Sequence, residues 1–183
     1  MIVPVEEKLR ALLGELIYGA DVPNLETVVL TLLNKNGMTL GTAESCTGGL
    51  IAKRMTDVPG SSAVFKGGVV SYCNEIKANV LGVPQVLLDE FGAVSESVAK
   101  AMAEGARKVL DCDLAVAATG VAGPGSDDQG NPAGLVYVAL AAPNGTYVRE
   151  LRLSGASRQR VRTTAAHHAF DMVRRFLGDF REI

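Results

Sequence analysis

The run Asp113–Thr119, with the sequence DLAVAAT, is the feature that most constrains how this chain folds. A strand with one face in water alternates apolar and polar residues, whereas a strand covered on both faces is a near-continuous apolar run. We therefore expect Asp113–Thr119 to form a central strand that is covered on both faces. The glycine-rich segment Gly120–Ser126 follows directly, and ligands of α/β sheets tend to bind at this end of a strand.

Helical and extended patterns alternate along the rest of the chain. Strands are predicted at Met38–Ala43, Gly67–Tyr72, Gly134–Ala142 and Tyr147–Leu153. The last two flank Asn144-Gly145, a pair that favours a hairpin turn. Helices are predicted within residues 1–22 and at 25–36, 50–55, 75–81, 84–91, 95–110 and 157–176, with Asn24, Asn74, Ser95 and Ser157 as N-caps. This order predicts one α/β domain whose mixed β-sheet is flanked by helices.

The first 22 residues are set apart by an amphipathic pattern. Apolar side chains recur at helical spacing at Val5, Leu9, Leu12, Leu13 and Leu16. We predict an N-terminal helical extension over residues 1–22, followed by the main domain over residues 23–180. The apolar face of the extension needs a cover, which favours a contact in a homo-oligomer.

Composition excludes several classes of protein. The net charge is −2, and aromatic residues make up 5% of the chain. Nucleic-acid binders usually carry a concentrated positive surface or stacking aromatics, so we expect no nucleic-acid partner. The sequence has no long apolar run and no basic leader followed by an apolar stretch. We therefore expect no membrane span and no secretory signal.

The three cysteines, Cys46, Cys73 and Cys112, are an odd number at wide spacing. They fit neither a disulfide framework nor a zinc site, so we expect a reducing cytoplasm and no metal ion. Cys46 follows a serine near a helix start, where a thiol can be reactive. As a small apolar side chain, it is better interpreted as part of the packing.

The segment Glu44–Gly49, with the sequence ESCTGG, is the first candidate site. A serine between a strand and a helix lies near unpaired backbone N–H groups, which favour a phosphate or a developing oxyanion. The glycines allow a ligand to come close to the backbone. Alternatively, Ser45 or Thr47 only caps the helix, and spacing alone favours that interpretation.

Lys77 lies a few residues after the strand predicted at Gly67–Tyr72 and is a candidate base. Burial disfavours an ammonium ion, so a buried lysine can titrate near neutral pH and take a proton from a serine. The alternative is a solvated lysine on a short helix, since lysine is almost always exposed. Because Ser45 and Lys77 lie far apart in the sequence, their spacing does not pair them.

Two further segments are candidates for binding an anion. The loop that begins at Thr119 and Gly120 can donate backbone N–H groups, although a plain tight loop is an equal alternative. Arg158, Arg160 and Arg162 begin the last helix, where positive charge opposes the helix dipole and therefore suggests a function. A solvated helix face is the alternative for at least two of the three.

Taken together, these segments resemble the C-terminal domain family of the competence/damage-inducible protein CinA, whose members include stand-alone nicotinamide-nucleotide amidases. The matching blocks are Thr42–Gly49 (TAESCTGG), Val58–Ser62 (VPGSS), Phe65–Lys77 (FKGGVVSYCNEIK), Leu81–Val83 (LGV), Gly92–Ser95 (GAVS) and Thr119–Pro124 (TGVAGP). The resemblance extends from about Leu25 to Phe176 and implies the α/β fold of that family. So many ordered blocks are far more specific than any one of them.

The resemblance implies a metal-independent amidase without a cofactor. Its substrate would be a small pyridine mononucleotide, nicotinamide mononucleotide, which it converts to nicotinic acid mononucleotide and ammonia. Ser45 would be the nucleophile, Lys77 its base, and Tyr72 a hydrogen-bonding or proton-shuttling partner. The substrate-binding residues that the resemblance implies are Thr47, Gly48, Gly49, Thr119, Gly120 and Arg162, the last for the phosphate. Longer family members also carry a pyrophosphatase-like N-terminal module, which we do not expect in a chain of this length.

Departures from the family pattern leave other functions open. Asn131 stands where the family usually has lysine, and Ser157 where it commonly has aspartate. The missing lysine removes one anion contact, so amidase action on another small amide is an alternative. A non-catalytic nucleotide-binding or regulatory module is a second alternative. The complete set of Ser45, Tyr72 and Lys77 favours the enzyme.

Overall fold

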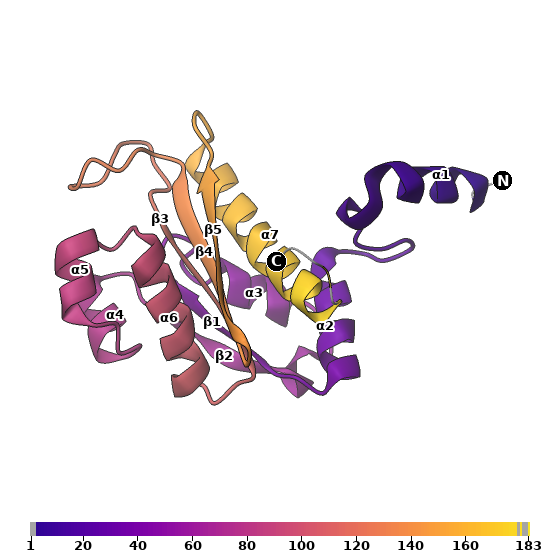
Figure 1. The fold of residues 1–183 in the computed structure, drawn as a ribbon, viewed down its shortest axis with the longest axis horizontal. Coiled ribbons are helices and arrows are strands. Elements are labelled where there is room, and N and C mark those ends of the chain that lie inside the picture. Colours follow the sequence, from indigo (N-terminus) through magenta and orange to yellow (C-terminus); the bar gives the residue numbers. More distant parts are fainter. Residues whose placement is uncertain (1–2, 179, 181–182) are drawn as a thin grey trace.

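The computed structural model describes residues 3–178, 180 and 183. Their centre is a five-stranded sheet with the strand order β2-β1-β3-β4-β5 (Figure 1). The strands are β1 (Leu40–Glu44), β2 (Phe65–Val70), β3 (Leu114–Gly120), β4 (Leu135–Ala142) and β5 (Gly145–Arg152). β1 pairs in parallel with β2 and β3, whereas β4 pairs antiparallel with β3 and, in the predicted hairpin, with β5. This mixed sheet confirms the predicted fold class.

β3 is the central strand, as its apolar run predicts. Leu114, Val116 and Ala118 belong to the core on one face of the sheet, and Ala115 and Ala117 to the core on the other. All five side chains are fully buried. The two alanines are small, so a helix can pack close to the backbone of the sheet on their side.

Helices cover both faces of the sheet (Figure 1). The core around Leu114 is closed by α2 (Leu25–Asn36), α3 (Leu50–Thr56) and α7 (Arg158–Leu177). The core around Ala115 is closed by α4 (Asn74–Asn79), α5 (Gln85–Phe91) and α6 (Glu96–Val109). A short 3₁₀ turn, η2 (Ser61–Ala63), leads into β2. Every element of the predicted order is thus present, with ends that differ by a few residues.

Three predicted helix caps are confirmed and one is wrong. The side chains of Asn24, Ser95 and Ser157 each accept a hydrogen bond from the backbone N–H three residues later. Asn74 is not a cap, because it already lies in the first turn of α4. The residue with extended backbone before that helix is Cys73, and its side chain makes no capping bond.

The N-terminal helix α1 (Val3–Leu13) and the turn η1 (Gly14–Leu16) stand apart from the sheet and its helices (Figure 1). Their apolar side chains are exposed: Val5, Leu9, Leu12, Leu13 and Leu16. Glu15 ties the segment to α7, because Arg174 donates to its carbonyl and Arg175 pairs with its carboxylate. The amphipathic helix is confirmed. The division of the chain into an extension over residues 1–22 and a domain over residues 23–180 stays a prediction. The role of the extension in a homo-oligomer contact also stays a prediction.

Candidate active site

Ser45 lies in the turn between β1 and α3, at the carboxyl edge of the sheet. Its N–H donates a 2.9 Å hydrogen bond to the carbonyl of Ala118, which extends the pairing of β1 with β3 by one residue. The carbonyl of Ser45 accepts a 3.1 Å hydrogen bond from Gly48. Gly48 (φ 58°) and Gly49 (φ 89°) have left-handed backbone, which glycine adopts without steric cost. The sheet and this turn together fix the position of Ser45.

Lys77 contacts Ser45, a pairing that their spacing in the sequence does not predict. β2 is the parallel neighbour of β1, so the segment after β2 lies at the same edge of the sheet. Lys77 on α4 is 1% exposed, and its Nζ donates to Oγ of Ser45 at 3.1 Å and to the carbonyl of Ser71 at 2.8 Å. The alternative of a solvated lysine is therefore wrong.

Burial also sets the chemistry of Lys77. Removal from water disfavours the ammonium form and lowers the pKa of Lys77 from its ordinary value of 10.5. Within the described residues, Lys77 forms no ion pair with a carboxylate that would oppose this effect. A neutral amine at hydrogen-bond distance from a hydroxyl can accept its proton, and a serine nucleophile requires such a base.

Glu44 is a residue of this site whose role the sequence analysis missed. It is buried, and its carboxylate accepts 2.9 Å and 2.8 Å hydrogen bonds from the N–H groups of Ile51 and Ala52, at the start of α3. The carboxylate, rather than Ser45 or Thr47, therefore caps the helix. Glu44 precedes the helix by six residues, whereas the usual N-cap patterns involve a residue next to the first turn. No short sequence pattern signals such a cap.

Three N–H groups of the turn are still without an acceptor among the described residues, those of Cys46, Thr47 and Gly49. Because Glu44 takes the first-turn groups of α3, those groups do not serve an anion as the sequence analysis expects. The N–H groups of Cys46, Thr47 and Gly49, however, donate to no acceptor within residues 3–178, 180 and 183, and those of Thr47 and Gly49 flank Gly48 in the turn. In the same described residues, the buried hydroxyl of Thr47 has no hydrogen-bond partner either. Unpaired N–H groups in the turn of a nucleophile are suited to bind an oxyanion.

Arg162 reaches the same turn from α7. Its Nε donates to the carbonyl of Cys46 at 3.2 Å, and its Nη2 donates to the carbonyl of Thr47 at 2.6 Å. Arg162 is thus brought to the turn of Ser45, and two of its donors bind protein carbonyls there. This contact joins α7 to the nucleophile turn over more than a hundred residues of sequence, and no local pattern predicts it.

Tyr72 lies at the exposed rim of the site. Its side chain is 63% exposed, and its hydroxyl accepts a 3.1 Å hydrogen bond from Arg158. Arg158 also donates a 2.9 Å hydrogen bond to the carbonyl of Gly123, in the loop after β3. Tyr72 directly follows Ser71, whose carbonyl holds Lys77. The exposed Arg158 therefore joins Tyr72 with the glycine-rich loop after β3.

Thr119 and Gly120 end β3 beside Ser45, and both have structural contacts there. The Thr119 hydroxyl donates a 2.6 Å hydrogen bond to the carbonyl of Ala93 and is buried. A Cβ on Gly120 would lie 2.6 Å from the carbonyl oxygen of Leu135, so β3 needs glycine at this point. The substrate-binding role of Thr119 and Gly120 stays a prediction.

The thiol of Cys46 packs in the core, as its small apolar side chain indicates. Burial raises its pKa to about 12, so the thiol is protonated at neutral pH. Among the described residues, no three or more His, Cys, Asp or Glu side chains gather into a group that could hold a metal ion.

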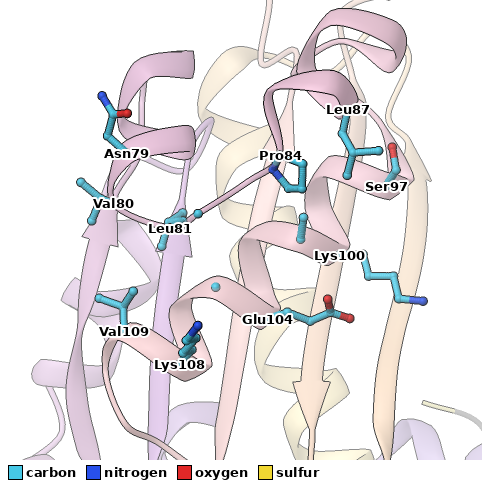
Figure 2. A pocket seen from close by; sticks show the side chains of 13 residues that line it. Asn79, Val80, Leu81, Pro84, Leu87, Ser97, Lys100, Glu104, Lys108 and Val109 are labelled. Atoms are coloured by element: carbon cyan, nitrogen blue, oxygen red, sulfur yellow. The ribbon is translucent and has the colours of Figure 1, made fainter.

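A cavity of about 730 Å³ lies away from this site, between the link from α4 to α5 and helix α6 (Figure 2). Its lining includes Leu81 and Pro84 from the link, and Lys100, Glu104 and Lys108 from α6. Ser45, Tyr72 and Lys77 do not contribute to it. This cavity is therefore separate from the serine–lysine pair.

The fold and the site together define an α/β domain with a buried serine–lysine pair at the carboxyl edge of a mixed sheet. The family model of the CinA C-terminal domain matches residues 23–177. The chain therefore belongs to the CinA C-terminal domain family.

Relatives and solved structures agree with this membership. A competence-damage inducible relative from Caldanaerobacter subterraneus subsp. tengcongensis is 55% identical over 177 residues, which cover 97% of this chain and 43% of the relative. The structure of the competence/damage inducible protein CihA from Agrobacterium tumefaciens is 39% identical, with a TM-score of 0.81, over 88% of this chain and 98% of that one. A CinA superfamily structure from Klebsiella pneumoniae is 33% identical, with a TM-score of 0.81, over 85% and 97%.

The chain spans about 43% of the length of the curated relative that it resembles at 55% identity. Among the described residues, no helix has the length and apolar character needed to cross a membrane.

Proposed function

We propose that this chain is a metal-independent amidohydrolase that converts nicotinamide mononucleotide to nicotinic acid mononucleotide and ammonia. The observation that carries the proposal is the 3.1 Å contact between Nζ of the buried Lys77 and Oγ of Ser45. A serine hydroxyl is a weak nucleophile until a base takes its proton, and a lysine with a lowered pKa is such a base. The choice of substrate rests on the family resemblance.

In the first half of the reaction, neutral Lys77 takes the proton of the Ser45 hydroxyl while Oγ attacks the carboxamide carbon. The carbonyl oxygen becomes an oxyanion, for which the unpaired N–H groups of Thr47 and Gly49 are suitable donors. The protonated Lys77 then gives its proton to the amide nitrogen, and the C–N bond breaks. Ammonia leaves, and the acyl group remains bound to Ser45 as an ester.

In the second half, a water molecule gives a proton to Lys77 and its oxygen attacks the ester carbon. Lys77 returns this proton to Oγ of Ser45 as the ester C–O bond breaks, and the product leaves as a carboxylic acid. Lys77 is thus base and acid in turn, as general acid–base catalysis requires. Tyr72, next to Ser71 in sequence, is proposed as a hydrogen-bonding partner of this proton transfer.

The test is ammonia release from nicotinamide mononucleotide with EDTA present, with Ser45→Ala as the matched control. We expect release by the unaltered chain and none by the variant. Binding of the nucleotide in a calorimeter without turnover would instead favour a non-catalytic nucleotide-binding or regulatory module. Neither binding nor turnover would reject nicotinamide mononucleotide as the substrate.

An amidase for another small amide is the second candidate, and one observation favours it. Asn131, which stands where the family usually has lysine, donates 2.8 Å hydrogen bonds from its N–H and its side-chain amide to the carboxylate of Asp127. The side chain closes its own loop and presents no positive charge to a phosphate. A panel of amides with and without a phosphate, assayed for ammonia release, separates the two candidates.

A further inference from the structure

Arg162 holds the turn of Ser45 by two successive peptide carbonyls, those of Cys46 and Thr47. The peptide bond between these two residues is trans, and a trans peptide directs its C=O and its N–H to opposite sides. The guanidinium that holds the Cys46 carbonyl therefore directs the N–H of Thr47 away from itself. That N–H is one of the three in the turn that have no acceptor among the described residues.

We propose that Arg162 is a positioning residue for the oxyanion site and not a ligand of the substrate phosphate. This inference rests on the proposed function, because it concerns the oxyanion formed when Ser45 attacks an amide. Arg162 acts through the peptide between Cys46 and Thr47, whose orientation it fixes. It touches neither the substrate nor the reacting atoms.

Charge adds to this geometry. A cationic donor on the C=O of a peptide polarises that peptide, so the N–H at its other end becomes a stronger donor. Arg162 supplies this through a planar fork that reaches both carbonyls at once. A lysine brings the same charge as a single point and does not hold two carbonyls in one plane.

The turn is held from its other end by Glu44. Its carboxylate fixes the first N–H groups of α3, those of Ile51 and Ala52, whereas Arg162 fixes the carbonyls of Cys46 and Thr47. A Cβ on Gly48 would lie 3.5 Å from Nη2 of Arg162, so the guanidinium packs directly against the turn. A turn that is fixed at both ends keeps its N–H groups in place before substrate arrives, and such preorganisation is the source of oxyanion stabilisation.

The first test compares Arg162→Lys with Arg160→Lys. Arg160 lies on the same helix turn and is exposed, and its side chain forms no hydrogen bond or ion pair among the described residues, so the solvated alternative applies to it. The substrates are nicotinamide mononucleotide and nicotinamide riboside, which lacks the phosphate. We expect Arg162→Lys to lower kcat by about 10²-fold on both, with KM unchanged, as for the loss of an oxyanion donor. We expect Arg160→Lys to match the unaltered chain. A rise in KM confined to the phosphorylated substrate would overturn the proposal and make Arg162 a phosphate ligand.

A second test does not depend on the identity of the substrate. A fluorophosphonate probe phosphonylates an activated serine and places an oxygen where the oxyanion forms. We expect labelling of Ser45 to slow by about 10²-fold in Arg162→Lys and to be unchanged in Arg160→Lys. Equal rates in all three chains would overturn the positioning role alone. If Arg162→Lys is labelled more slowly but the unaltered chain releases no ammonia from nicotinamide mononucleotide, only the proposed substrate is rejected. If Ser45 of the unaltered chain is not labelled at all, both the proposed function and the positioning role are overturned.

Arg162→Ala separates positioning from a general effect on folding. Free guanidinium ion at millimolar concentration fits the space that the side chain leaves, so we expect it to restore part of the labelling rate of this variant. A variant whose rate stays low at every guanidinium concentration below its unfolding transition would contradict the proposal. Circular dichroism at increasing guanidinium concentration identifies that transition in each chain.

Discussion

The carbonyl of Ser71 accepts a 2.8 Å hydrogen bond from Nζ of Lys77, a shorter contact than the 3.1 Å from Nζ to the hydroxyl of Ser45. A carbonyl oxygen can only accept, so an N–H of the lysine points to Ser71. The lone pair of the neutral amine is then free to face the hydroxyl of Ser45. This arrangement orients the base as well as placing it.

Removal of either member of this pair is expected to abolish most of the activity. Ser45→Ala and Lys77→Ala should each lower kcat for ammonia release by about 10³-fold or more, and the double variant should lose no more than the worse single one. Residues that act as a unit give such non-additive losses. Steady-state assays of the three variants check this, and a Lys77→Ala chain with a near-normal rate would contradict the assignment of the base.

The activity is expected to rise with pH. Lys77 takes a proton only in its neutral form, and burial lowers the pKa of Lys77 from 10.5, so the neutral fraction grows as pH rises through that lowered value. A profile of kcat/KM against pH should therefore climb and reach its plateau before pH 10.5. A rate that still rises about tenfold per pH unit up to pH 10.5 and levels off only above it would show a lysine with an ordinary pKa.

Lys77 is expected to lower the free energy of unfolding at neutral pH. Its pKa is lowered in the fold and close to 10.5 in the unfolded chain, so between these values the unfolded state binds one more proton. The free energy of unfolding therefore falls as pH falls through this window. Lys77→Met lacks this effect, so its advantage over the unaltered chain should grow as pH falls from 10.5. Urea unfolding at several pH values measures it.

The matched control for this measurement is Lys100→Met, because Lys100 is exposed on α6. Its effect on the free energy of unfolding should be nearly independent of pH over the same window. A pH-dependent difference of the same size in both variants would mean that burial of Lys77 is not its cause.

Glu44→Gln is expected to weaken the start of α3. A glutamine oxygen accepts only on one side of the side chain, so the N–H of Ile51 or of Ala52 loses its acceptor. An unpaired buried donor costs about 1–3 kcal/mol, which urea unfolding detects. Glu90→Gln on the exposed side of α5 is the control and should change stability little. An unchanged midpoint for Glu44→Gln would show that the carboxylate does not cap the helix.

The cysteines are expected to differ sharply in alkylation. Burial raises the pKa of Cys46 to about 12 and that of Cys112 to about 11, whereas Cys73 is exposed. Iodoacetamide at mildly alkaline pH should therefore modify Cys73 alone, because the thiolate is the reactive form. Mass spectrometry of the native and the unfolded chain checks this. Modification of Cys46 in the native chain would contradict its packed position.

The sequence predicts the framework well where the signal is local. The apolar run of β3, the cap at Asn24 and the hairpin between β4 and β5 each depend on neighbouring residues, and all are present. Even the turn that carries Ser45 follows from a strand pattern, two glycines and a helix pattern in succession. Family resemblance adds the pairing of Ser45 with Lys77, which local patterns leave open.

What local patterns miss are contacts made by topology. Lys77 is buried because it follows β2, and β2 lies beside β1 in the sheet. The spacing of residues along the chain does not predict this strand order. Arg162 donates hydrogen bonds to the carbonyls of Cys46 and Thr47, which precede it by more than a hundred residues in the sequence. Glu44 caps a helix that begins six residues later, at a distance that no capping pattern covers. Each is a long-range or unusual contact of a charged side chain.

The hydrogen bond from the N–H of Ser45 to the carbonyl of Ala118 makes Ser45 an extension of the central sheet. Lys77, in contrast, lies on α4, a helix of six residues that follows an edge strand. Parts of a protein with few buried contacts open more readily than its central strands. Mild heating should therefore separate Lys77 from Ser45 while the sheet is still intact. Loss of the proposed activity would then precede unfolding, and its thermal limit would be set at the edge of the sheet and not at its centre.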